Sequence, residues 1–235
     1  MPDSAPPAAE PRPAASVIIV RDAPPGAPEP IEVYMVRRQR SMKFLGGFYA
    51  FPGGKVDPGD AASSVLDGCR GLDAARAAEC LPAHGDLPPL AFWVTAVREL
   101  LEESGVMLAE AGWRCDLRPL RYLSHFVTPR TSPIRFSARF FLCRLPAGQA
   151  PRLYTEETSE GFWIHPGDGY RRFRADEMAM AEPAEYGLAY IAQFRSVDEL
   201  WAACDDNREK FTGIVDRIEF QFWKDFDWGA GRWNR

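Results

Sequence analysis

Three glutamates recur at helical spacing in the segment 98–106, and no other feature constrains the fold of this chain as strongly. Glu102 and Glu103 stand three and four residues after Glu99. Because an α-helix repeats every 3.6 residues, this spacing places all three carboxylates on one helical face. Like charges on one face repel each other, so such a helix is more stable when a cation lies between them. The pattern alone also fits a solvated acidic surface. The flanking residues are therefore needed to distinguish a cation site from such a surface.

An apolar stripe runs beside the acidic face of this segment. Val94, Val97 and Leu101 recur every three or four residues, and Gly105 is a stop signal for a helix. Asp86 precedes the stripe and is expected to cap the helix at its N-terminus. The sequence therefore predicts a helix that buries one side and exposes its acids.

Two adjacent glycines, Gly53 and Gly54, stand upstream after a short apolar segment and lead to Asp57 and Asp60. Glycine permits a close approach between backbones and a positive φ. From Gly54 onward the residues fit a known box: Gly, five residues, an acid, a gap, then Arg-Glu-U-x-Glu-Glu-x-Gly-U, where U is aliphatic. The second half matches at every fixed position, and Asp60 stands where glutamate is usual. The chain therefore resembles the Nudix hydrolase superfamily.

The gap inside this box is unusually long. Residues 61–97 separate Asp60 from Arg98, so about 30 residues are inserted where the family has seven. The two halves can still meet in space, because the cost of closing a surface loop grows only with the logarithm of its length. The split box, with similar segments at 46–52 and 125–141, resembles the branch that contains the peroxisomal coenzyme A diphosphatase.

The resemblance implies an α/β fold, a Nudix-type α/β/α sandwich with a mixed sheet between helices. We expect one domain at 15–235, with the insertion at about 61–87 and a helical C-terminal extension at about 166–235. Residues 1–14 are rich in Pro and Ala and predict a disordered tail. Local patterns predict strands at 16–20, 31–36, 121–127, 134–145 and 160–165, the first two as a hairpin, and helices at 72–81, 184–194 and 197–204.

Bulk composition argues against some classes of partner. The net charge of -5 provides no general attraction to nucleic acid or to an anionic membrane. No apolar run is long enough to span a bilayer, and the first residues lack the pattern of a secretory signal, so we expect a cytoplasmic protein. The five cysteines show no Cys-x-x-Cys spacing, which predicts reduced thiols.

The chemistry that the resemblance implies is hydrolysis of a diphosphate. A diphosphate concentrates negative charge, so its hydrolysis needs a cation that neutralises the charge and lowers the pKa of the attacking water. Hard carboxylate oxygens suit Mg²⁺ or Mn²⁺. By their places in the box, Glu99, Glu102 and Glu103 are the implied metal ligands, and Gly54 can add its carbonyl. Glu99 is also the first candidate for the general base.

Other charged residues are expected to support this site. Arg98 can pair with Glu102 or orient a ligand through its rigid fork of donors, and we favour orientation. Asp60 either steadies Arg98 or a metal-bound water, or only caps a turn. Glu157 and Glu160, near the strand predicted at 160–165, are candidates for an additional acid, although a solvated loop also explains them.

Basic and aromatic residues before the box are candidates for substrate binding. The basic residues that can meet the phosphates of a nucleotide are Arg37, Arg38, Arg40 and Lys43, and Phe48 can stack on its base, whereas a solvated loop and a core strand are the alternatives. We expect coenzyme A or an acyl-coenzyme A as substrate, and ADP-ribose or another dinucleotide as the runner-up. A non-catalytic nucleotide sensor is the competing class. The aromatic segment 220–228 predicts a packing surface or a homodimer contact.

Overall fold

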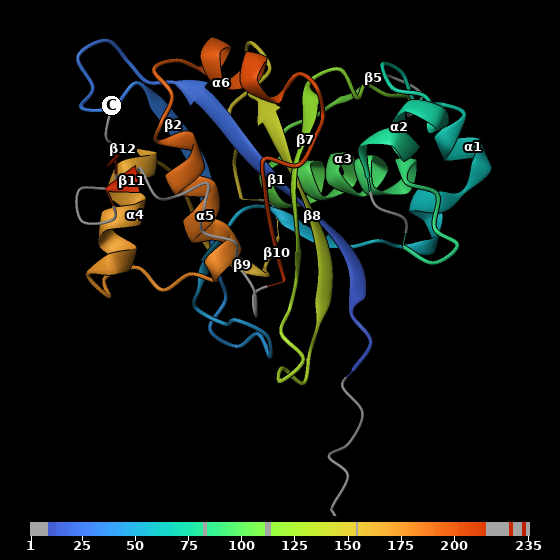
Figure 1. The fold of residues 1–235 in the computed structure, drawn as a ribbon, viewed down its shortest axis with the longest axis horizontal. Helices are drawn as coiled ribbons and strands as arrows, with labels where there is room; N and C mark the ends of the chain where they lie inside the picture. The colour runs from blue at the N-terminus through green and yellow to red at the C-terminus, as the bar shows by residue number, and fades with distance from the viewer. Residues whose placement is uncertain are drawn as a thin grey trace, which may run out of the picture.

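A computed structural model of the chain describes residues 9–81, 84–110, 114–153, 155–214, 226–227 and 232–233. These residues form an eight-stranded mixed sheet with helices on both faces (Figure 1), which confirms the predicted α/β class. The strands of the sheet are β1 (Arg12–Asp22), β2 (Ile31–Arg38), β3 (Tyr49–Ala50), β4 (Gly53–Lys55), β7 (Leu120–Val127), β8 (Phe136–Arg144), β9 (Thr158–Ile164) and β10 (Phe211–Ile214). The helices are the 3₁₀-helix η1 (Pro58–Ala61) and α1 (Ser63–Leu66), α2 (Ala74–Cys80), α3 (Leu90–Ser104), α4 (Pro166–Arg174), α5 (Glu182–Ile191) and α6 (Val197–Cys204).

The long strand β1 determines the topology of the sheet. One side of β1 runs parallel to β8, and the other side pairs antiparallel first with β4 and then with β2. The predicted hairpin of β1 and β2 is therefore confirmed. Beyond these strands, β9 and β3 pair with β2, while β7 pairs with β8 and β10 lies at the far edge. Because β4 pairs with the start of β1, the two glycines of the box are held against the sheet.

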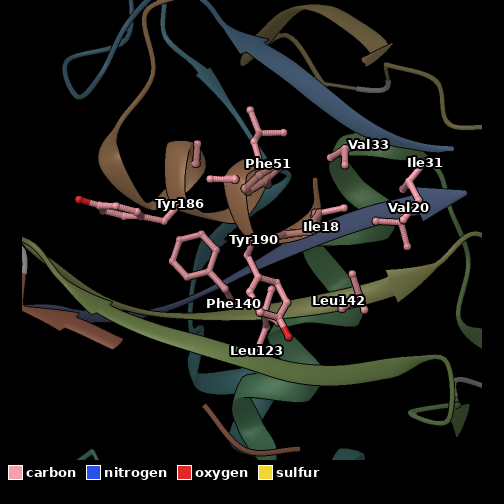
Figure 2. Packing of buried hydrophobic residues seen from close by; sticks show 14 of the residues in the cluster. Ile18, Val20, Ile31, Val33, Phe51, Leu123, Phe140, Leu142, Tyr186 and Tyr190 are labelled. Atoms are coloured by element: carbon pink, nitrogen blue, oxygen red, sulfur yellow. The ribbon is translucent and has the colours of Figure 1, made fainter. Parts of the chain in front are cut away.

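Both faces of the sheet are buried, as the continuous apolar run in β1 requires. Val17 and Ile19 belong to a core cluster shared with α2 and α3, whereas Ile18 and Val20 belong to one shared with α4, α5 and α6. Figure 2 shows Ile18 in this second cluster with Tyr190 from α5. The box helix α3 thus covers one face together with α2, and the C-terminal helices cover the other.

Two predicted boundaries were wrong. β1 begins at Arg12 and not near Ala15, because the residues before Ala15 already pair with β8 and β4; residues 1–8 of the predicted tail lie outside the described part. Asp86 does not cap α3, whose cap position is Pro89. Two prolines at the start of the helix bring no backbone N–H groups, so fewer donors need a cap there.

The C-terminal extension is not purely helical. The predicted helices correspond to α5 and α6, but Phe211–Ile214 form β10, which runs parallel to β7. The sequence did not delimit α4 as a separate helix within this extension, because its two glycines lower its helix propensity; α4 packs against α5. Two short pairs complete the described elements: β5 (Ala109–Glu110) with β6 (Arg114–Cys115), and β11 (Phe226–Asp227) with β12 (Arg232–Trp233). Most of the aromatic segment 220–228 lies outside the described residues.

All five cysteines are free thiols in this structure. In the described part of the chain, no helix has the length and apolar character needed to cross a bilayer.

Glu185 lies on the buried side of α5 and is 7% exposed. Burial raises its pKa to about 7, whereas an unfolded chain ionises glutamate at about pH 4.3. Since the unfolded state ionises first, ionisation of Glu185 favours unfolding as the pH rises through this range. Glu185→Gln is therefore expected to stabilise the protein by about 3–4 kcal/mol at about pH 8 and by only about 1 kcal/mol at about pH 5.

Thermal denaturation at the two pH values measures this difference. Glu79→Gln is the matched control, because the Glu79 side chain is 63% exposed on α2 and its loss should have the same small effect at both pH values. Equal effects of Glu185→Gln at both pH values would contradict the burial argument.

Candidate active site

Arg98 of α3 joins the two halves of the box. Its Nε and Nη2 donate to the two carboxylate oxygens of Asp60 at 3.0 and 2.9 Å, and Nη2 also donates to the Lys55 carbonyl at 2.8 Å. Nη1 donates to Glu99 at 2.7 Å and to Glu102 at 3.1 Å. The insertion therefore leaves the loop and the helix in contact, and Arg98 orients carboxylates on both sides.

Asp60 is 4% exposed and fully engaged. Besides Arg98, it accepts from the Thr95 hydroxyl at 2.8 Å and from the Asp57 backbone N–H at 2.9 Å. Burial alone would raise the pKa of Asp60, but these hydrogen bonds outweigh it and the pKa lies below its ordinary value. Of the alternatives open from the sequence, Asp60 both steadies Arg98 and closes the turn at η1.

The two glycines bring β4 against the acids of α3. The Gly53 N–H donates to Glu103 at 3.0 Å. A Cβ atom on Gly53 would lie 2.5 Å from the carbonyl oxygen of Ala15, and one on Gly54 would lie 2.3 Å from Oε1 of Glu99. Neither glycine has a positive φ. Glycine is needed here for close approach and not for a left-handed backbone.

The three glutamates differ in burial. Glu99 and Glu103 are 8% and 6% exposed, whereas the Glu102 side chain is 56% exposed. Burial raises the pKa of Glu99, although Arg98 partly opposes this, and burial raises the pKa of Glu103 to about 7. Buried acids with raised pKa values favour a neutralising partner, and a divalent cation is such a partner.

The acids do not converge on one point in this structure. Within the described ranges, no three His, Cys, Asp or Glu side chains form a group that could hold a metal ion. Glu99 and Glu102 instead share Arg98, and Glu103 accepts from Gly53. The donor set nevertheless fits Mg²⁺ or Mn²⁺, because it offers hard carboxylate oxygens and a glycine backbone that approaches Glu99 closely.

Arg37 and Glu160 lie across the sheet from these acids. They pair at 2.8 Å between β2 and β9, and the Arg37 guanidinium lies 5.2 Å from the centre of the Tyr49 ring. Tyr49 packs against the core cluster of α5, on the face opposite α3. The structure therefore does not bring Arg37 or Glu160 to the predicted site.

Arg38 and Glu157 lie near Glu103 instead. Beyond the effect of burial, the charge of Arg38 lowers the pKa of Glu103 and the charge of Glu157 raises it. The Glu157 carbonyl also accepts from the backbone N–H of Gln39 at 2.8 Å, which places the two segments side by side. Glu157 thus stays a candidate for the additional acid. Strand alternation distinguishes Arg38 from Arg37, because Val36 faces α3 and residue 38 lies on the same side of β2.

The remaining predicted residues lie in the loop 39–48 between β2 and β3. Arg40 and Lys43 are exposed, and Phe48 is half-buried. Among the described residues, none of the three has a hydrogen bond or ion pair with the acids of α3. Substrate binding by this loop stays a prediction.

Thr95 is a contributor that the sequence did not indicate. Its side chain is fully buried, and its hydroxyl lies 2.8 Å from Asp60 and 2.9 Å from the Ala91 carbonyl. Thr95→Val keeps the shape but removes a hydrogen bond to a buried carboxylate, so we expect a loss of about 1–2 kcal/mol of stability at about pH 7.

The control variant is Thr95→Ser, which keeps the hydroxyl and loses a methyl group. Chemical denaturation should show a loss for Thr95→Val that shrinks in acid, as Asp60 with its lowered pKa becomes protonated, and a loss for Thr95→Ser that does not depend on pH. Identical pH profiles for the two variants would show that the hydroxyl does not support Asp60.

Similarity to known proteins identifies the family of this chain. No protein-family model matches the chain. The crystal structure of a NUDIX hydrolase from Alicyclobacillus acidocaldarius, however, is 31% identical with a TM-score of 0.68, over 83% of this chain and 96% of that one. This chain belongs to the Nudix hydrolase family. The box with its long insertion is thus a Nudix box whose halves Arg98 holds together.

Curated relatives of this Nudix chain are more distant. A Caenorhabditis elegans protein named nudix hydrolase 7 is 28% identical over 74% of this chain and 58% of its own length. Acyl-coenzyme A diphosphatases of Gallus gallus and Homo sapiens are 25% and 26% identical, over 80% and 77% of this chain and 70% and 66% of their own lengths. The chain therefore spans little more than half of the worm protein and about two thirds of the vertebrate ones.

Proposed function

We propose that this Nudix hydrolase is a diphosphatase that adds water across the diphosphate of a nucleotide derivative. The observation that carries the proposal is the network in which Arg98 holds Asp60, Glu99 and Glu102 together. Such a network orients acidic groups before the substrate binds. This preorganisation allows an enzyme to stabilise the charge that develops in the transition state. Membership of the Nudix family and the intact acids of the box support hydrolysis over a non-catalytic sensor.

The proposed cofactor is Mg²⁺ or Mn²⁺. Glu99, Glu102 and Glu103 would hold the metal, with the Gly54 carbonyl as a further oxygen ligand. The bound metal would neutralise diphosphate charge and lower the pKa of the attacking water.

We assign two further roles in this mechanism, orientation of the acids and general-base catalysis. Arg98 keeps Glu99 and Glu102 oriented through its Nη1. Glu99 is the proposed general base, since burial raises its pKa and thereby makes its carboxylate a stronger proton acceptor. Glu157 is the alternative base, because it lies within electrostatic range of Glu103.

The proposed substrate is coenzyme A or an acyl-coenzyme A, which would be cleaved to 3′,5′-ADP and a 4′-phosphopantetheine fragment. Similarity to the two vertebrate acyl-coenzyme A diphosphatases supports this choice. The exposed Arg40 and Lys43 offer charge for the 3′-phosphate that coenzyme A carries in addition to its diphosphate. We further propose that the enzyme acts in the cytoplasm on small nucleotides, without nucleic acid or membrane partners, and that it is a homodimer.

A substrate panel tests the proposal. The full chain is incubated with Mg²⁺ and coenzyme A, an acyl-coenzyme A, ADP-ribose or NADH, and the products are separated by chromatography and identified by mass. We expect the highest kcat/KM for a coenzyme A compound. A preference for ADP-ribose or NADH would keep the chemistry and overturn the substrate. Binding without turnover for the whole panel would instead support the nucleotide sensor.

A further inference from the structure

A thiol from the insertion and a thiol from the domain body lie side by side. The backbone N–H of Arg70 donates to the Cys115 carbonyl at 2.8 Å, and that of Leu117 donates to the Arg70 carbonyl at 2.9 Å. These bonds make a parallel β-bridge between Arg70 and Asp116. Cys69 and Cys115 each precede a bridged residue, so the register sets them opposite each other. Paired residues on neighbouring strands are about 5 Å apart, within the range of Cα separations that a disulfide spans.

The two thiols are also close enough to influence each other's ionisation. Their interaction raises the pKa of Cys69 and lowers the pKa of Cys115, and the Cys69 thiol donates to the Val65 carbonyl at 3.5 Å. Cys115 is thus the sulfur that forms a thiolate more readily, and the thiolate is the reactive form. Cys115 is 8% exposed and Cys69 is half-buried, so only a small oxidant has access.

We infer that Cys69 and Cys115 are a site of reversible oxidation by a small peroxide. The Cys115 thiolate attacks one oxygen of hydrogen peroxide, the O–O bond breaks, and the leaving hydroxide takes a proton to become water. The Cys69 sulfur then attacks the resulting sulfenic acid at sulfur, the S–O bond breaks, and the hydroxide leaves as water with the Cys69 proton. Two thiols lose two electrons to form one disulfide, and the peroxide is reduced to two waters.

The disulfide would join the insertion to β6, the second strand after α3. Cys69 lies three residues after the end of α1, which follows η1 with its Asp60, whereas Cys115 ends β6. The cross-link closes a loop of residues 69–115, and closing a loop of this length restricts the unfolded chain. We expect the oxidised protein to melt about 5 °C higher than the reduced protein. This inference is independent of the proposed activity.

Mass spectrometry and thermal denaturation of the full chain test the inference. The reduced protein is treated with hydrogen peroxide, its remaining thiols are alkylated, and it is digested without reductant. We expect a peptide pair linked through Cys69 and Cys115, and a rise in Tm that dithiothreitol reverses.

Serine variants supply the controls. Cys69→Ser and Cys115→Ser should each abolish both the linked peptide and the rise in Tm. Cys80→Ser, a change in the same insertion at the end of α2, should preserve both. Oxidation of other cysteines without the linked peptide, or a rise in Tm that persists in both Cys69→Ser and Cys115→Ser, would overturn the inference. If one serine variant fails to fold, the other gives the same test.

Discussion

Replacing Glu102 by glutamine is expected to lower kcat of the proposed diphosphatase by about a thousandfold or more while leaving the fold intact. The Glu102 side chain is 56% exposed and meets Arg98 at 3.1 Å. An exposed ion pair of this kind contributes about 0–1 kcal/mol, so its loss hardly affects stability. Glutamine has nearly the same shape but lacks the charge that a divalent metal requires. The loss should therefore fall on metal-dependent turnover.

Steady-state kinetics with a magnesium titration and a melting curve measure both parts of this prediction. Glu79→Gln is a matched control, because Glu79 also pairs with an arginine on a helix surface, at 2.6 Å from Arg76, and lies outside the proposed site. It should retain wild-type kcat. Retained turnover in Glu102→Gln would contradict the proposal that the acids of the box helix hold the catalytic metal.

Replacing Arg98 by methionine is expected to cost both stability and activity. The variant leaves the buried carboxylate of Asp60 without its bidentate partner at 3.0 and 2.9 Å. Removing one partner of a buried ion pair costs about 3–5 kcal/mol, because the other charge stays buried. Activity should fall as well, since Glu99 and Glu102 lose the group that orients them.

The pH dependence separates this mechanism from a general packing defect. Asp60 has a lowered pKa in the folded protein, so its pairing stabilises the fold above the unfolded value of about 3.9 and is lost as the pH falls through the folded value. The deficit of Arg98→Met in denaturant unfolding should therefore shrink in acid. Arg98→Lys keeps the charge without the fork and should be intermediate. A deficit that is constant with pH would contradict the ion-pair account.

The sequence predicted the parts of the molecule that local pattern determines. Leu101 and its stripe placed α3, and Gly105, with a φ of 67°, ends that helix as a glycine stop predicts. The contact between Arg98 and Asp60 followed from the box, even though residues 61–97 interrupt it. These features depend on short-range spacing or on a motif, and both survive an insertion.

The features that the sequence missed depend on tertiary placement. Arg37 and Arg38 are equally basic neighbours, and only the alternation of β2 separates the one beside Tyr49 from the one near Glu103. Thr95 looks like an ordinary helix residue until the loop carrying Asp60 returns to its hydroxyl. Phe211–Ile214 become a strand only because the edge of β7 is available beside them.

Cleavage of coenzyme A with and without divalent metal is the decisive test of a metal-dependent diphosphatase. The full chain is incubated with coenzyme A and Mg²⁺, and the products are identified by mass, with a chelator in the parallel reaction. We expect 3′,5′-ADP and 4′-phosphopantetheine in the first reaction and neither product in the second. Cleavage that is unaffected by the chelator and equally fast in Glu102→Gln would contradict this expectation.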